Sequence, residues 1–229
     1  MSNQKIQLKK SHKTYSQYVS SGVEWIGDVP KGWEVKKLKR FSRILNGATP
    51  KSDNLDFWDG DIKWVTPDDL SKLKNEELYE TRRMITKEGY YSCGTQVVPK
   101  NNLILSTRAP IGLCTINRVD VCANQGCRGI VLKNNNDERY YYYVLISFND
   151  ILNSFGSGST FRELSRQKLG DFIFPAPPNS EQKKIADYLD EQNKKIDTLI
   201  QKIEQSIQLL QEYKTSLISS VVRGRIKIS

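Results

Sequence analysis

Residues 179–223, NSEQKKIADYLDEQNKKIDTLIQKIEQSIQLLQEYKTSLISSVVR, form one helical pattern with no proline and no glycine. Apolar residues recur in it at a spacing of seven: Leu189, Ile196, Ile203, Leu210 and Leu217. Globular helices usually run about 8 to 20 residues, so an uncapped pattern of this length is typical of a coiled coil. At 1.5 Å per residue the helix would be roughly 65 Å long. That is too long for the preceding domain to cover, so the stripe needs another helix.

The stripe is broad but interrupted. Ile200, Ile207, Tyr213 and Val221 widen it, while polar residues interrupt it at Gln192, Ser206 and Ser220. This pattern suits a partner helix in one specified register better than a simple two-stranded zipper. We predict pairing with another chain or subunit through Leu189, Ile196, Leu199, Ile203, Leu210 and Leu217. The alternative is a solvated helix that packs on its own domain.

The charge balance is basic, with a formal net charge of +9. The excess of lysine and arginine lies in residues 1–40 and 81–179, whereas residues 41–80 are acidic. Such a balance suits a polyanionic partner, although a soluble basic protein without one remains the alternative. No apolar run reaches the roughly 18 residues of a membrane span, and residues 1–10 lack the apolar core of a signal peptide. A cytoplasmic protein is expected.

The sequence offers little for catalysis or metal binding. Cys93, Cys114, Cys122 and Cys127 form no CxxC pair and lie far from the only histidine, His12, so we expect reduced thiols rather than a zinc site. The glycine loop at 155–158 follows a helical pattern, whereas a loop that binds S-adenosylmethionine follows a strand. The acidic pieces of a nuclease, Asp68-Asp69 and Glu181, are far apart. We expect no catalytic residue, no metal site and no cofactor in this chain.

The rest of the chain predicts an α+β fold, a mixed α/β globular domain followed by one long helix. Residues 1–20 read as a basic flexible arm, 21–178 as the domain and 179–229 as the coiled-coil helix. Short strands are predicted at 62–65, 95–98, 103–106, 113–116, 119–122, 129–132 and 172–174, and helices at 141–155 and 162–169. Residues 175–178, PAPP, predict a stiff hinge. Asn179 and Gln182 have the spacing of a capping box.

Three polar loops suit the reading of nucleic acid. Residues 106–110 place an arginine and two hydroxyls on a turn, 124–128 place two amides and an arginine around a glycine, and 156–162 combine hydroxyls with an arginine. Arginine pairs with guanine, glutamine with adenine, and hydroxyls with phosphates. An ordinary structural turn is the alternative for each loop. The candidate DNA contacts are Arg108, Gln125, Arg128, Ser157, Ser159, Thr160 and Arg162.

The sequence resembles the specificity subunits of Type I restriction-modification systems from about Tyr15 onward. The resemblance is carried by the order and spacing of several degenerate motifs: SGVEWIGDVP at 21–30, WEVKKL at 33–38, GATP at 47–50, WDGDIKW at 58–64, NQG at 124–126, and the passage from Pro175 through Glu181-Gln182 into the long helix.

The resemblance implies a target-recognition domain for double-stranded DNA. It also implies methyltransferase subunits as partners, which bind S-adenosylmethionine, and, where present, a restriction subunit that uses ATP and Mg. Family members usually carry two such domains and two long helices that pair antiparallel, whereas this chain has one of each. We therefore expect a half-subunit form that works as a homodimer on a bipartite site. The alternative is a non-catalytic coiled-coil scaffold whose domain binds protein.

Overall fold

The computed structural model describes residues 14–73, 76–108, 110–156 and 163–228. The chain divides into two compact units, Met1–Lys183 and Lys184–Ser229. The first turn of the long helix thus lies in the same unit as the residues before it. We refer to the first unit as the head. A mixed α/β head followed by one long helix confirms the predicted fold class.

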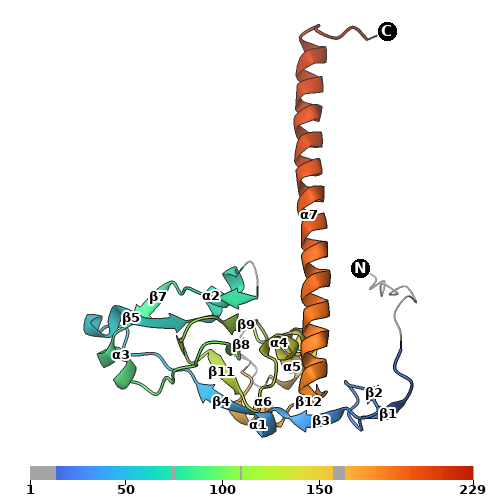
Figure 1. Ribbon diagram of the computed structural model, residues 1–229. Coiled ribbons are helices and arrows are strands. Elements are labelled where there is room, and N and C mark those ends of the chain that lie inside the picture. The colour runs from blue at the N-terminus through green and yellow to red at the C-terminus, as the bar shows by residue number, and fades with distance from the viewer. Residues whose placement is uncertain (1–13, 74–75, 109, 157–162, 229) are drawn as a thin grey trace. The chain divides into compact units, whose positions relative to one another are not determined.

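The largest sheet of the head has the strand order β4-β11-β8-β9-β6. These strands are Ser42–Asn46, Cys127–Leu132, Asn102–Ser106, Cys114–Asn117 and Glu77–Leu78. Neighbours are antiparallel except β6, which lies parallel to β9. Every residue of the central strand β8 is buried, as its apolar run Leu103-Ile104-Leu105 favours. Helix α4 (Glu138–Ser147) packs on β8 and β9 (Figure 1).

A second sheet has the order β10-β5-β7, formed by Cys122–Ala123, Trp58–Val65 and Arg83–Ile85. The predicted strand at 62–65 is the end of β5. It stops where expected because Thr66 caps helix α2 (Pro67–Lys72), whose first residue is a proline. Asp69 completes the capping box by accepting from the Thr66 backbone.

The remaining elements of the head are short. Strand β1 pairs with β2, and β3 pairs with β12. The bounds are β1 Tyr18–Ser20, β2 Asp28–Pro30, β3 Glu34–Lys37, α1 Leu38–Phe41, η1 Leu55–Phe57, α3 Lys87–Tyr91, α5 Asn149–Phe155, α6 Arg166–Asp171 and β12 Ile173–Ala176. Strand β1 falls within the segment that the sequence treats as a loose arm, and residues 1–13 of that segment lie outside the described residues.

Several predicted elements differ from the structure. Residues 95–98 form no strand, because only Val98 makes an isolated bridge, to Val121. The helix predicted at 141–155 is two helices, since Phe148 leaves helical geometry between α4 and α5. The helix predicted from residue 162 begins at Arg166, with Ser165 as its cap.

The predicted hinge at 175–178 is wrong for its first half. Pro175 and Ala176 belong to strand β12, where they pair with Val35 and Glu34 of β3. Phe174 and Ala176 are buried. A proline is tolerated here because β12 has a strand on one side only.

The predicted capping box at the start of the long helix α7 (Asn179–Val222) is also wrong. Asn179 is itself helical, and its side-chain amide donates to the Asn134 carbonyl at 2.7 Å. Gln182 is buried, and its amide donates to Pro177 O at 2.9 Å and Asn136 Oδ1 at 3.0 Å while its oxygen accepts from Asp137 N at 3.0 Å. The first turn of α7 is thus fixed by backbone and side-chain groups of the head.

Helix α7 runs unbroken for 44 residues, as the sequence predicts. Within the single chain its apolar stripe is exposed: Ile196 by 54%, Ile203 by 52% and Leu210 by 66%. Leu199 and Leu217 are exposed as well, and Leu189 is half-buried. In the part of the chain that is described, no helix is both long and apolar enough to cross a membrane.

Candidate functional site

Two of the three predicted loops meet at one end of the large sheet. In the β8–β11 ladder Cys127 lies opposite Ser106, and Arg128 lies opposite Leu105. The Thr107 amide donates to Gly126 O at 2.7 Å, which closes the two strand ends on each other. Arg108 follows directly after this contact. The loops at 106–110 and 124–128 are therefore neighbours in space, although they are separate in sequence.

A third segment joins them just after the predicted loop at 156–162. Leu164 donates from its backbone amide to Thr107 O at 2.8 Å, and Glu163 forms an isolated antiparallel bridge with Arg108. The Glu163 carboxylate lies between the two arginines. Its Oε2 is 3.0 Å from Arg108 Nε, and its Oε1 is 3.5 Å from Arg128 Nη2. We call Arg108, Arg128 and Glu163 the arginine cluster.

The two arginines of the cluster differ in exposure. The side chain of Arg108 is 47% exposed and that of Arg128 only 12%. Arg128 donates from Nη1 to the carbonyls of Gln125 at 3.0 Å and Cys127 at 3.1 Å. Its buried Nε has no partner among the described residues. Burial is the main cause that lowers the pKa of this guanidinium from its ordinary value. Arg128 therefore supports the turn at 124–128, while Arg108 is the arginine with freedom to reach a ligand.

The exposed side chain of Gln125 is held against a second segment of the head. Its Oε1 accepts from the hydroxyl of Thr49. Ala48 donates to Ala123 O at 2.9 Å, and a Cβ at Gly47 would lie 1.8 Å from Asn124 O, so only glycine permits this approach. The GATP and NQG motifs, far apart in sequence, thus form one surface.

The four remaining candidates, Ser157, Ser159, Thr160 and Arg162, lie outside the described residues. The contacts proposed for them stay predictions.

Sequence reasoning missed Glu163 and Thr49. Glu163 follows Arg162 directly in the sequence, but only the fold shows that its carboxylate bridges two arginines from two other segments. Thr49 belongs to the GATP motif at 47–50, which supports the family resemblance but by itself predicts no contact with Gln125. The sequence signal for this contact is a hydroxyl two residues after Gly47, since a glycine allows two backbone segments to approach closely.

The cysteines are free in this chain, and Cys122 and Cys127 are buried. Burial raises the pKa of the Cys122 thiol to about 11 and that of Cys127 further. Metal-binding cysteines act as thiolates, a form that these environments disfavour. Among the described residues no group of three or more His, Cys, Asp or Glu side chains is arranged to hold a metal ion.

Comparison with known families gives one match that covers most of the chain. The pattern of the family described as Type I restriction modification DNA specificity domain matches residues 30–209. The Type I restriction enzyme MjaIX specificity subunit of Methanocaldococcus jannaschii is 35% identical over 186 residues, which cover 78% of this chain and 43% of that protein. The chain spans less than half the length of the curated relatives it matches.

Solved structures share the fold. A chain from a study of complex assembly and conformational transition of the type I R-M system superposes with a TM-score of 0.73 at 21% identity, over 87% of this chain and 48% of that one. The HsdS subunit from Thermoanaerobacter tengcongensis superposes with a TM-score of 0.61 at 20% identity, over 80% and 41%. At these identities the likeness shows the fold alone.

Proposed function

The chain belongs to the Type I restriction modification DNA specificity domain family, and from that premise we propose that its head reads a specific sequence in double-stranded DNA. In this proposal the long helix joins two copies and docks methyltransferase subunits. The chain thereby directs those subunits, and a restriction subunit where one is present, to a bipartite site.

The observation that carries the proposal is the convergence of the loops at 106–108 and 124–128 at the end of one sheet. Arg108, Gln125 and Thr49 are polar side chains that reach this surface from three separate segments. Arginine and glutamine are the side chains that pair bidentately with guanine and adenine. A rigid strand ladder beneath them fixes their spacing, which direct readout requires.

The helix supports the second half of the proposal. The apolar stripe of α7, which we call its seam, is largely exposed to solvent in the single chain. A second copy of α7 offers a stripe of equal length, and a two-fold pair uses the same surface on both copies. Antiparallel pairing is the arrangement that family membership implies. Identical heads related by a two-fold axis read identical half-sites in opposite orientation, which predicts an inverted-repeat site.

We further propose that the chain itself catalyses no reaction and needs no cofactor. S-adenosylmethionine then belongs to the methyltransferase partner, and ATP with Mg belongs to a restriction subunit. The cytoplasm is the proposed site of action.

Titration of the purified chain with a labelled random-sequence duplex at 50 and 200 mM salt tests DNA binding. Affinity should fall steeply with salt, because lysine and arginine displace counterions from phosphates. A scaffold that binds only protein would show no binding at either salt concentration. Transfer of a labelled methyl group to DNA by the rigorously purified chain would contradict the non-catalytic assignment.

A further inference from the structure

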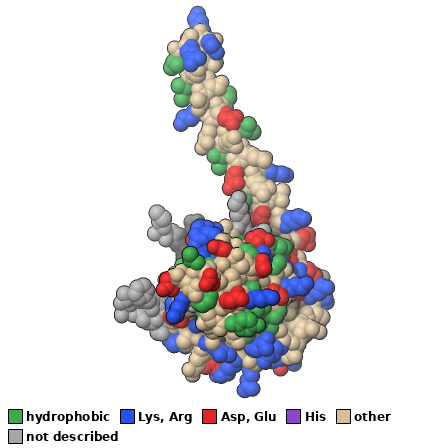
Figure 2. All heavy atoms as spheres, turned by 90° about the vertical axis from the view of Figure 1, so that its left-hand side faces the viewer, with side chains coloured by type: hydrophobic (Ala, Val, Ile, Leu, Met, Phe, Trp, Pro, Cys, Tyr) green, Lys and Arg blue, Asp and Glu red, His purple; other side chains and the backbone are tan. Residues whose placement is uncertain are grey.

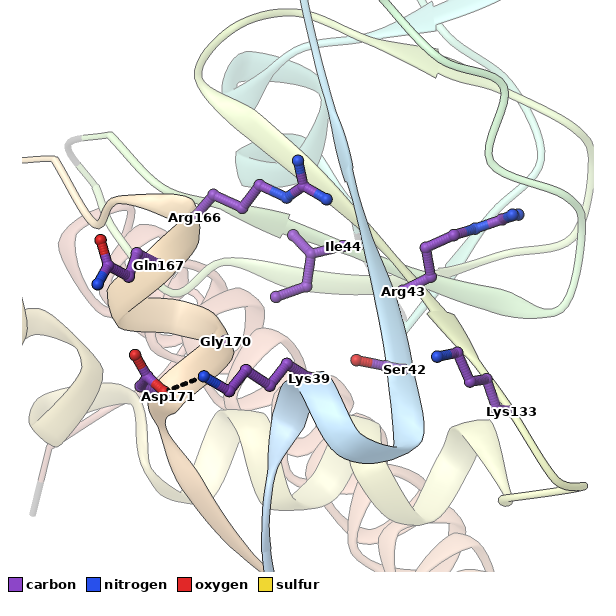
Figure 3. Close-up of a pocket in the computed structure, with 9 residues that line it drawn as sticks. All are labelled: Lys39, Ser42, Arg43, Ile44, Lys133, Arg166, Gln167, Gly170 and Asp171. Atoms are coloured by element: carbon purple, nitrogen blue, oxygen red, sulfur yellow. Dashed lines mark ion pairs between the residues drawn. The ribbon is translucent and has the colours of Figure 1, made fainter.

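A groove of about 520 Å³ runs along the free edge of strand β4. One wall is α6, which contributes Arg166 and Gln167. The other is β4 with Arg43, and Lys133 follows β11. Gly170 of α6 and Ile44 of β4 also line the groove. Figure 3 shows these side chains around the groove.

The groove is strongly cationic. Its lining includes four basic side chains, Lys39, Arg43, Lys133 and Arg166, and the carboxylate of Asp171. Asp171 is occupied by Lys39 at 2.7 Å and Lys37 at 3.1 Å. Arg43, Lys133 and Arg166 make no ion pair within the described residues. In Figure 3 the side chains of Arg43 and Arg166 point away from the Lys39–Asp171 pair, and Lys133 reaches toward strand β4 beside Ser42. Three unpaired cations around one groove attract an anion.

Two links relate the groove to the arginine cluster. Arg166 lies three residues after Glu163, and its charge acts on Arg128. In the β4–β11 ladder Arg43 pairs with Val131, and Asn46 pairs with Arg128. Three residues along a strand span roughly 10 Å. A DNA strand advances about 3.4 Å per nucleotide, so the same distance corresponds to about three nucleotides.

One other face of the head has a more mixed charge. Figure 2 shows the side that carries β5, α2 and α3, where acidic and basic side chains are interspersed. Lys63 there pairs with Glu80 at 2.6 Å, and Asp68 pairs with Lys72 and Arg82.

We propose that this groove binds the phosphodiester backbone of the DNA duplex whose bases lie at the arginine cluster. The inference rests on the proposed function. It assigns phosphate binding to residues other than those proposed to contact the bases. Arg43, Lys133 and Arg166 neutralise phosphates and set the register of the duplex. They carry no sequence information themselves, because every nucleotide presents the same phosphate.

The test compares the full-length chain with the double variant Arg43→Ala/Lys133→Ala. Each phosphate contact contributes about 0.9 to the slope of log affinity against log salt. Between 50 and 200 mM salt the wild-type affinity should therefore fall about ten-fold more than that of the double variant. The variant should bind more weakly to every duplex by a similar factor and prefer the same sequence. Both side chains are exposed, so an unchanged thermal melting curve is expected to confirm folding.

Lys87→Ala/Lys100→Ala is the matched control. It removes two exposed lysines that do not line the groove and should leave the salt slope within error of wild type. A control that lowers the slope as much as the groove variant would overturn the assignment, since the effect would then come from net charge.

Three further outcomes separate this inference from the proposed function. Wild-type chain that binds no duplex at any salt concentration overturns both. Wild type that binds, with a groove variant of unchanged affinity and slope, overturns the groove alone. A groove variant that keeps DNA binding but no longer assembles with methyltransferase subunits assigns the groove to an acidic protein surface and also overturns the proposal.

Discussion

The head and the long helix use the same apolar residue types with opposite results. Leu103, Ile104 and Leu105 of the central strand are fully buried within one chain, whereas Ile196 and Ile203 of α7 are more than half exposed. The head completes its own hydrophobic core, and the helix does not. The difference indicates that the head is the part that can act as a single copy, and that the helix is the part built for assembly.

The largest expected effect is the loss of dimerisation when two charges are placed in the seam of α7. The head should not be affected. Ile196→Asp/Ile203→Asp removes two side chains worth about 1.5–3 kcal/mol each when buried, and it places like charges along the interface. Light scattering should show a dimer for wild type and a monomer for the variant, with unchanged melting of the head.

Gln201→Asp/Gln208→Asp is the control for that change. It adds the same two charges at seven-residue spacing on exposed positions outside the seam. The control should stay dimeric. A wild-type chain that remains monomeric at high concentration, and also in complex with its methyltransferase, would refute the pairing.

Gln182→Ala should give the next largest effect and lower the stability of the head, although the residue lies in α7. The buried amide donates to Pro177 O and Asn136 Oδ1 and accepts from Asp137 N. A buried group left without its partner costs about 1–3 kcal/mol. Urea unfolding should show this decrease in the free energy of unfolding for Gln182→Ala. The control Lys183→Ala, which changes an exposed neighbouring residue, should show almost no decrease. Equal unfolding midpoints for the two variants would mean that Gln182 does not fix the start of the helix.

Arg108→Ala should change DNA recognition without changing folding. One bidentate pairing with a base is worth about 1–3 kcal/mol of discrimination, or roughly 5- to 150-fold. Binding to the preferred duplex should fall while melting of the protein stays the same. Arg82→Ala is the matched control, because Arg82 is also an exposed arginine paired with a carboxylate, at 3.1 Å from Asp68. An Arg108→Ala chain that selects the same sequence with the same affinity would make Arg108 a solvated residue.

Glu163→Gln should have the smallest effect on DNA binding. It should raise the affinity, whereas Arg108→Ala should lower it. The carboxylate lies between Arg108 and Arg128 and repels DNA phosphates. Loss of the ion pair with the exposed Arg108 should cost about 0.2–1 kcal/mol of stability, and loss of the pair with Arg128, which is only 12% exposed, should add to that cost. Binding to random duplexes should strengthen a few-fold, while discrimination between duplexes weakens because Arg108 is no longer held in place. Unchanged affinity for both classes of duplex would exclude this role.

The predictability of the two regions also differs, for a physical reason. The helix is specified by a local repeat, so its length and exposed seam could be predicted from residues 179–223 alone. In the head, elements are short and their ends depend on partners distant in sequence. Residues 95–98 have a strand-like sequence but make a single bridge, and Pro175 joins a strand because β3 lies beside it.

The candidate site shows the same limit. Its loops could be chosen from composition, since arginines and amides on turns are local features. The separate roles of Arg108 and Arg128 could not be predicted from the sequence, because the burial of Arg128 depends on the turn at 124–128 and on Glu163. The groove cations come from β4, α6 and the end of β11, and no local pattern connects them.

The central claim is that the head recognises a DNA half-site and that the long helix pairs two copies of the chain. Selection from a pool of random duplexes, followed by sequencing, tests this claim directly. The wild-type chain should enrich a bipartite inverted repeat with a fixed spacer, and Ile196→Asp/Ile203→Asp should enrich the single half-site alone. An asymmetric bipartite motif from wild type, or no enrichment with either chain, would contradict this account.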